Sequence, residues 1–223
     1  MSSNYELREP LRRQGIVFAL VGPAGVGKTT LCKNLVAEFS DSLVLSVSAT
    51  TRQARPDELD GISKHFLTRD AFQDKISDNE LFEWEEVHGN FYGTLRKTLR
   101  ETIYAGKDLL LDIDVRGALK FKSQLPNLTV ICFVLPPNVT ELKNRIVSRS
   151  PVSESELYTR LDTAKEEYLV MQELLLTKQH VDYLVINDVK EDAYQAVRAQ
   201  LLAERTRALR ILAEDITTVC QFS

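Results

Sequence analysis

The segment from Gly22 to Thr29 constrains the fold of this chain most strongly. It reads GPAGVGKT and fits the pattern G-x-x-x-x-G-K-[ST]. Glycines let successive backbone N–H groups point at one anion, and a following helix adds the positive end of its dipole. Lys28 would bring a positive charge to the β- and γ-phosphates of a nucleotide, and Thr29 would offer its hydroxyl to Mg²⁺. We therefore predict nucleoside-triphosphate binding by Gly22, Pro23, Ala24, Gly25, Val26, Gly27, Lys28, Thr29 and Thr30.

The sequence on both sides of this loop has the pattern that such a motif requires. The preceding run Ile16–Val21 is apolar and has the length of a strand. After the loop, Leu31, Leu35 and Phe39 recur at helical spacing. Strand, loop and helix therefore follow one another in the expected order.

Strand-length apolar runs alternate with helical patterns along most of the chain. The candidate strands are Ile16–Val21, Leu43–Val47, Leu109–Ile113, Val130–Leu135 and Tyr183–Ile186. The candidate helices are Lys28–Phe39, Leu95–Ala105, Gly117–Gln124, Val139–Ser148, Glu154–Lys178 and Glu191–Glu214. Because several strands are continuously apolar, they fit a parallel sheet that is buried on both faces. The alternation predicts a doubly wound α/β fold around the P-loop.

Two regions depart from this alternation. Residues 48–94 contain a polar stretch, a short helix near Ala71–Ser77, and two strands joined by a His-Gly-Asn turn, which together predict an inserted α+β subdomain. The polar segment Arg149–Arg160 interrupts two helices and is a candidate lid. Helix-start signals of the capping-box type lie before it, Asn138 with Glu141, and within it, Ser153 with Glu156.

Composition excludes several classes of partner. With 28 basic and 32 acidic residues the net charge is −4, so no basic field indicates nucleic acid. No apolar run approaches the roughly 20 residues of a membrane helix, and residues 1–14 lack a signal-peptide core. The cysteines Cys32, Cys132 and Cys220 form no paired motif, which favours reduced thiols in a cytoplasmic protein. The choice between a monomer and a homo-oligomer stays open.

Two arginines follow the second predicted strand. Arg52 and Arg55 lie near the carboxyl edge of the sheet, where open α/β sheets bind ligands. The arginine fork matches the geometry of phosphate, so the pair could clamp a second phosphate group. The alternative is a solvated basic loop.

A second cluster lies in the predicted hairpin FEWEEVHGNFYGT, residues 82–94. A buried carboxylate can accept two parallel hydrogen bonds from guanine N1–H and N2–H₂, a donor pair that adenine lacks. Glu83 could therefore discriminate between the bases. Taken alone, the cluster is no more than a polar hairpin.

Seven segments together resemble the guanylate kinase family. In order, they are GPAGVGKTTL (22–31), SVSATTRQARPDELDG (46–61), FEWEEVHGNFYGT (82–94), LLLDIDVRGA (109–118), LKNRIVSR (142–149), TRLDTA (159–164) and VIND (185–188). The resemblance spans the chain from Ile16 to about Arg205. It implies a kinase-like domain at 16–205, with a GMP-binding insert at about 48–95 and a lid at about 138–165. An N-terminal arm (1–15), which we expect to be frayed, and a C-terminal helical extension (206–223) would flank the domain.

The resemblance also implies the reaction and the site. The γ-phosphoryl group of ATP would pass to GMP, and Mg²⁺ would be bound at Thr29 and, through water, at Asp112. The implied residues for GMP are Ser48, Arg52, Arg55, Lys64, Glu83, Tyr92, Thr94, Asp112 and Asp114. Lys28, Arg52 and the lid arginines Arg145, Arg149 and Arg160 would act in catalysis. Asn187 would lie near the adenine.

The chain departs from the family pattern at two positions. Ala24 stands where the family has serine, in a loop that acts mainly through its backbone. Lys64 stands where the family has a tyrosine that helps bind the GMP phosphate. A lysine could still reach an anion, but with different geometry. We expect GMP affinity to depend on Lys64 as a substitute cation.

Two other functions fit parts of the sequence. One is a catalytically inactive guanylate-kinase-like module that binds protein partners, but such modules are expected to have lost P-loop residues that this chain keeps. The other is a kinase of a different small phosphorylated acceptor. In the C-terminal tail, Leu209, Leu212 and Ile216 share one helical face, which either packs on the core as part of a longer final helix or mediates self-association.

Overall fold

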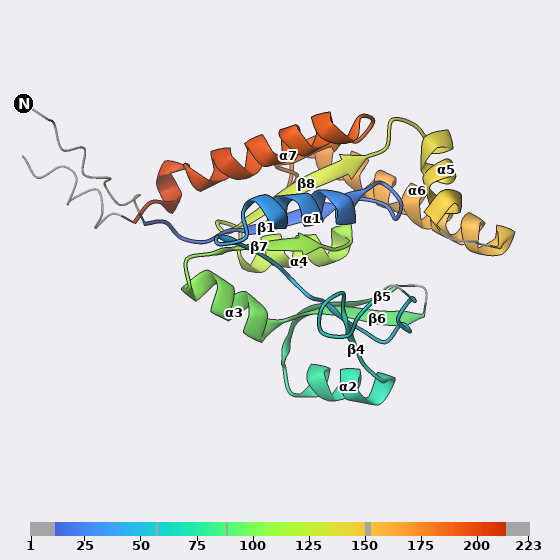
Figure 1. The fold of residues 1–223 in the computed structure, drawn as a ribbon, viewed down its shortest axis with the longest axis horizontal. Helices are drawn as coiled ribbons and strands as arrows, with labels where there is room; N and C mark the ends of the chain where they lie inside the picture. Colours follow the sequence, from blue (N-terminus) through green and yellow to red (C-terminus); the bar gives the residue numbers. More distant parts are fainter. Residues whose placement is uncertain (1–11, 57, 88, 150–152, 213–223) are drawn as a thin grey trace, which may run out of the picture.

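The computed structural model describes residues 12–56, 58–87, 89–149 and 153–212 (Figure 1). Five strands form a wholly parallel sheet in the order β2-β7-β1-β8-β9. They are β1 Val17–Val21, β2 Leu43–Leu45, β7 Asp108–Asp112, β8 Thr129–Leu135 and β9 Tyr183–Ile186. Each overlaps one of the strands predicted from the sequence. With β1 third in this order, the carboxyl ends of β7 and β8 lie on either side of the loop that follows β1.

Helices cover both faces of this sheet. They are α1 Lys28–Glu38, α3 Arg96–Tyr104, α4 Val115–Gln124, α5 Val139–Arg149, α6 Glu154–Leu176 and α7 Lys190–Arg205. Alternate residues of β1 enter two different hydrophobic clusters. Phe18 and Leu20 pack in one with side chains of α1, α5 and α7, and Val17 and Ala19 pack in the other with side chains of α3 and α4. The predicted doubly wound α/β core is confirmed, and the apolar runs are explained by burial on both sides.

The inserted region forms a second, four-stranded sheet in the order β4-β3-β6-β5, drawn below the main sheet in Figure 1. Its elements are β3 Ala49–Thr50, β4 His65–Phe66, α2 Arg69–Ser77, β5 Leu81–Val87 and β6 Asn90–Leu95. Ala49, Phe72 and Leu81 form its own small core. The insert is therefore α+β, as predicted, while the domain bounds of about 48–95 and 138–165 stay predictions.

Both helices of the predicted lid begin at the expected signals. The Asn138 side chain accepts from the Glu141 N–H at 2.8 Å, and Ser153 Oγ accepts from the Glu156 N–H at 3.2 Å. Each bond satisfies one N–H group that the first helical turn would leave unpaired. In the part of the chain that the structure describes, no helix has the length and hydropathy to cross a membrane.

The end of the chain differs from the sequence prediction. The last helix was predicted to reach Glu214, but α7 ends at Arg205, and a short 3₁₀ turn follows at Ala208–Arg210. The chain turns because the buried guanidinium of Arg210 donates to Glu204 at 2.5 Å and to the Asn127 carbonyl at 2.9 Å. A continuous helix would carry Arg210 away from both. The rest of the predicted extension, residues 213–223, lies outside the described residues.

The start and the end of the described chain pair with each other. Arg13 and Ile211 form an antiparallel bridge, in which the Gln14 N–H donates to the Arg210 carbonyl at 2.8 Å and the Leu212 N–H donates to the Arg12 carbonyl at 3.0 Å. The expectation of a frayed arm is therefore wrong for residues 12–15. Residues 1–11 are not among those described.

Candidate active site

The P-loop adopts a conformation that its glycines make possible. Gly22, Gly25 and Gly27 have φ values of 133°, 93° and 102°, which are costly for other residues. A Cβ on Gly27 would also lie 2.4 Å from the Asn187 side-chain nitrogen. That buried amide donates to the Val26 carbonyl at 2.7 Å. Asn187 therefore holds the loop itself, and its predicted contact with adenine stays a prediction.

Lys28, Thr29 and Asp112 converge where the loop meets the carboxyl end of β7. Lys28 Nζ donates to the Gly22 carbonyl and to the Pro23 carbonyl, the latter at 3.3 Å, and it lies 3.8 Å from Asp112 Oδ1. Thr29 Oγ1 donates to Asp112 Oδ2 at 2.9 Å. A hydroxyl and a carboxylate side by side are the hard oxygen donors that Mg²⁺ prefers, so these residues fit the predicted metal.

A cavity of about 190 Å³ opens between the two sheets next to this point. It is lined by Ser48, Lys64, Glu83, Val87, Tyr92, Gly93, Asp112, Ile113 and Asp114. Six of these are residues predicted for the acceptor nucleotide, and the structure thus brings them together. Asp112 belongs both to this cavity and to the P-loop cluster. Asp114 also caps α4, since its carboxylate accepts from the Gly117 N–H at 2.9 Å.

Glu83 is the most perturbed acid in this cavity. Burial raises the pKa of its carboxyl to about 7, and the nearby charge of Asp114 adds to this rise. The hydrogen bond from Thr94 Oγ1 at 2.7 Å acts in the opposite direction and lowers the pKa. The two residues face each other because β5 and β6 pair Glu83 with Thr94. A carboxyl half-ionised near neutral pH is poised for a ligand that donates hydrogen bonds.

A carboxylate that the sequence reading missed holds the two predicted phosphate-binding arginines. Glu58 accepts two hydrogen bonds from Arg52 NH2, at 2.9 and 2.8 Å, and one from the Arg55 N–H at 2.9 Å. Burial alone would raise the pKa of Glu58, but these partners outweigh it and lower that pKa. The signal was an acid three residues after Arg55, a spacing that suits a turn.

The predicted lid arginines differ in their surroundings. Arg145 donates to Glu141 at 2.7 Å and to the Asn187 carbonyl at 2.8 Å, so it connects α5 to the segment that supports the P-loop. Arg160 donates to Glu156, on its own helix, at 2.5 Å. Arg149 ends α5, and its side chain lies outside the described part of the structure.

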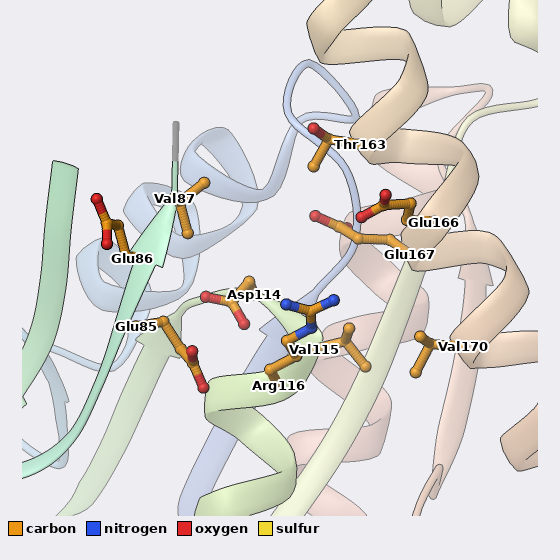
Figure 2. Close-up of a pocket in the computed structure, with 10 residues that line it drawn as sticks. All are labelled: Glu85, Glu86, Val87, Asp114, Val115, Arg116, Thr163, Glu166, Glu167 and Val170. Atoms are coloured by element: carbon orange, nitrogen blue, oxygen red, sulfur yellow. The ribbon is translucent and has the colours of Figure 1, made fainter. Parts of the chain in front are cut away.

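A second cavity of about 240 Å³ adjoins the first and shares Val87 and Asp114 with it (Figure 2). Glu167 of α6 lines it, and Oε2 of this residue is buried with no hydrogen-bond partner among the described residues. Burial raises the pKa of Glu167 to about 7, partly offset by Lys28. Arg116 of α4 is the cationic side chain of the lining, and Figure 2 shows it between Asp114 and Glu167. Sequence reasoning missed both residues because they look like solvated helix positions.

Together these features define a class of protein. A P-loop on an α/β core faces a separate acceptor cavity, and arginines lie in the inserted region and on the candidate lid. This is the arrangement of a nucleoside monophosphate kinase, a phosphotransferase with donor and acceptor subsites.

Comparison with known proteins narrows the class. The family model described as guanylate kinase matches residues 14–204. A guanylate kinase of Clostridium perfringens is 39% identical over 198 residues, covering 89% of this chain and 88% of the relative. One from Thermotoga maritima is 40% identical over 197 residues, covering 88% and 91%. The crystal structure of guanylate kinase from Anaplasma phagocytophilum superimposes with a TM-score of 0.76 at 30% identity, covering 96% of this chain and 98% of that one. This chain belongs to the guanylate kinase family.

Proposed function

We propose that this enzyme transfers the γ-phosphoryl group of ATP to GMP, and also to dGMP, giving ADP and the corresponding diphosphate. The position of Asp112 is the observation that carries the proposal. Its carboxylate is bonded to Thr29 of the P-loop and also lines the acceptor cavity. ATP in the donor subsite and GMP in the acceptor subsite would therefore both place their phosphates at the carboxyl end of β7.

Glu83, Ser48 and Thr94 would read the guanine. All three side chains are buried, and Glu83 and Thr94 are already hydrogen-bonded to each other. Guanine would donate N1–H and N2–H₂ to the Glu83 carboxylate, whereas adenine has no such donor pair and would leave Glu83 with only its hydrogen bond from Thr94. Discrimination by a missing hydrogen bond in a buried site is large, on the order of 10⁴-fold or more.

The acceptor phosphate would be held by Arg52, Arg55, Tyr92 and Lys64. Asp114 would close the cavity. Glu58 fixes the Arg52 and Arg55 segment before any ligand binds, so less freedom is lost on binding. The acceptor is already ionised at neutral pH, which removes the need for a strong general base. Its oxygen attacks the γ-phosphorus, and the electron pair of the breaking bond leaves with the β-phosphate of ADP.

The donor side would be held by the P-loop from Gly22 to Thr30, with Asn187 near the adenine. Lys28 and the lid arginines Arg145, Arg149 and Arg160 would neutralise the charge on the transferring group. Thr29 and, through water, Asp112 would hold Mg²⁺, which when bound neutralises and aligns the donor phosphates. Two of the cysteines, Cys32 and Cys132, are buried free thiols, which supports our placement of the enzyme in the cytoplasm.

The test is ADP release from ATP and Mg²⁺ with GMP, dGMP, AMP, UMP or dTMP as acceptor. We expect turnover only with GMP and dGMP. Glu83→Gln should lose most of the GMP turnover, because the amide presents a donor to the donors of guanine, while binding of ATP alone persists. Glu101→Gln, at an exposed position of α3, is the control. ATP binding without turnover on any acceptor would favour the catalytically inactive binding module, and turnover on another acceptor would favour a different small-molecule kinase.

A further inference from the structure

The backbone around Lys64 is fixed against Ser48, the residue that precedes β3. The Lys64 carbonyl accepts from the Gly61 N–H at 2.8 Å, and the next residue, His65, donates to the Ser48 carbonyl at 2.9 Å. The pairing of β3 with β4 continues from there. The side chain of Lys64 is thereby directed into the acceptor cavity, of which it forms part of the lining.

The side chain of Lys64 is half-buried where it lines the cavity. It makes no hydrogen bond or ion pair with any residue that the structure describes. Burial lowers the pKa of Lys64, and Asp112 at the end of β7 opposes that effect. The other groups that act on it are Arg52 and Glu58 on the inserted loop and Cys32 on α1. A partly desolvated cation without a partner is costly unless an anion arrives to pair with it.

Lys64 and Lys28 both interact electrostatically with the carboxylate of Asp112. Lys28 approaches Asp112 from the P-loop at 3.8 Å, and Lys64 approaches it from the acceptor cavity. The thiol of Cys32, whose pKa is raised mainly by burial, is also affected by Asp112, Lys28 and Lys64. These charges therefore gather at one place, where the donor and acceptor phosphates would meet.

We propose that Lys64 is a catalytic cation that contacts the oxygens of the γ-phosphoryl group while that group moves from ATP to the acceptor. The proposal rests on the function proposed above, and it goes beyond the role as a phosphate ligand expected from the sequence. Arg52 is already tied to Glu58 by two hydrogen bonds, and Lys28 is held by two carbonyls. Lys64 has no such bonds within the described part of the chain, so its side chain can follow charge that develops only in the transition state.

The test measures kcat and the KM values for GMP and ATP in Lys64→Met, Lys64→Arg and a control. Lys97→Met is the control, since Lys97 lies beside the inserted sheet on α3 with 82% of its side chain exposed. We expect Lys64→Met to lower kcat about 10²-fold and to raise the KM for GMP severalfold, with the KM for ATP within about threefold of the unaltered enzyme. Lys64→Arg should recover most of the rate, and Lys97→Met should change nothing.

Two results would overturn the proposal. If Lys64→Met raised the KM for GMP and left kcat unchanged, Lys64 would bind the ground state only. If neither constant changed, Lys64 would have no part in the reaction. Thermal unfolding and ATP binding of each variant separate these outcomes from misfolding. If the proposed function itself were wrong, the unaltered enzyme would not turn over GMP, and this result is distinct from both outcomes above.

Discussion

The carboxyl group of Glu83 must be ionised to accept two hydrogen bonds from guanine. Its pKa of about 7, raised by burial, means that the free enzyme carries it partly protonated at neutral pH. Guanine donors stabilise the ionised form, so GMP binding lowers this pKa and releases a proton. Affinity for GMP therefore rises as the pH increases through 7 and levels off above it.

We accordingly predict that the KM for GMP falls about tenfold between pH 6 and pH 8, as the ionised fraction of Glu83 grows. The phosphate of GMP also titrates in this range, with a pKa of about 6. Glu83→Gln isolates that second effect, since its KM should follow the substrate phosphate alone. The prediction would be contradicted if the KM for GMP changed with pH in the same way in the unaltered enzyme and in Glu83→Gln.

Gly117 offers a way to disturb Glu83 from a neighbouring helix. A Cβ at Gly117 would lie 3.1 Å from Glu83 Oε2, closer than side chains normally pack. We predict that Gly117→Ala raises the KM for GMP severalfold, because the carboxyl is displaced. The same change should stabilise α4 by up to about 1 kcal/mol, since alanine favours a helix over glycine.

Steady-state kinetics and thermal unfolding of Gly117→Ala measure these two effects separately. A KM that stayed constant would show that Glu83 can move aside at no cost. A lower unfolding temperature would show that the clash outweighs the helix propensity. A comparison of Ser123→Ala with Ser123→Gly, at an exposed position of α4, checks the propensity effect alone.

At the scale of single residues, the sequence located most of the candidate site through its motifs. Ser48, Lys64, Glu83 and Tyr92 meet in one cavity as expected. Glu58 and Glu167 were missed for a physical reason. Their importance depends on burial and on partners from distant segments, and charged residues with no motif around them normally indicate a solvated surface.

Helix starts are the element-scale features that local sequence predicts best. Asn138 caps α5, the helix that carries Arg145, with one bond to the Glu141 N–H. We predict that Asn138→Ala lowers the free energy of unfolding by about 1 kcal/mol, while Asn138→Ser retains most of it. Urea unfolding followed by circular dichroism measures both. Equal loss in the two variants would mean that the side-chain bond is not what stabilises this helix start.

Helix ends were predicted less well, and α7 shows why. Its apolar spacing continues past Arg205, and no glycine or proline marks the stop. The helix ends because a buried bond between Arg210 and Glu204 requires the chain to turn. Tertiary contacts of this kind outweigh helix propensity and leave no local signal.

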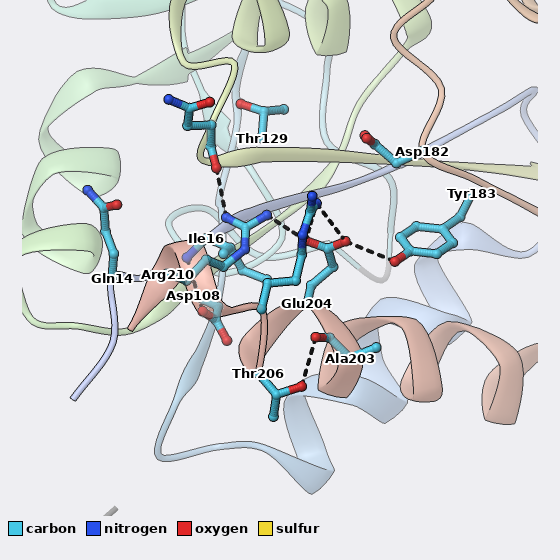
Figure 3. A network of polar contacts seen from close by, with 12 residues as sticks. Gln14, Ile16, Asp108, Thr129, Asp182, Tyr183, Ala203, Glu204, Thr206 and Arg210 are labelled. Atoms are coloured by element: carbon cyan, nitrogen blue, oxygen red, sulfur yellow. Dashed lines mark hydrogen bonds and ion pairs between the residues drawn. The ribbon is translucent and has the colours of Figure 1, made fainter. Parts of the chain in front are cut away.

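Across the whole molecule, β7 joins the site to a separate charged network at the opposite end of the sheet. Asp112 ends the strand in the site, and Asp108 begins it, fully buried. Asp108 accepts from Arg13 at 2.5 and 2.8 Å, from Arg205 at 2.7 Å and from the Ile16 N–H at 3.1 Å. Figure 3 shows Asp108 near the adjoining group in which Glu204 binds Arg210 and Tyr183.

We predict that Asp108→Asn destabilises the protein by about 3 kcal/mol, because it leaves two partly buried arginines without a full counter-charge. Both kcat and the KM values should stay unchanged, since the site lies at the other end of β7. Denaturant unfolding and steady-state kinetics measure the two effects, with the exposed Asp41→Asn as control. A loss of activity in folded Asp108→Asn would show that the two ends of the strand are coupled.

The fold class was predictable because the alternation of apolar strands and helices spans most of the chain. The meeting of the two ends at Asp108 was not, because Arg13 and Arg205 both bind this carboxylate from far away in the sequence. Residues 95 positions apart, such as Arg13 and Asp108, meet only once the sheet has formed.

The antiparallel bridge between Arg13 and Ile211 has a mechanical consequence. The chain leaves this pair on the same side, through Arg12 and Leu212. A force applied to the two outer segments would load the hydrogen bonds one after another, as in unzipping, and not all at once, as in shear. The ends should therefore peel apart at low force up to the arginines that hold Asp108, and the parallel sheet behind them should give the main resistance.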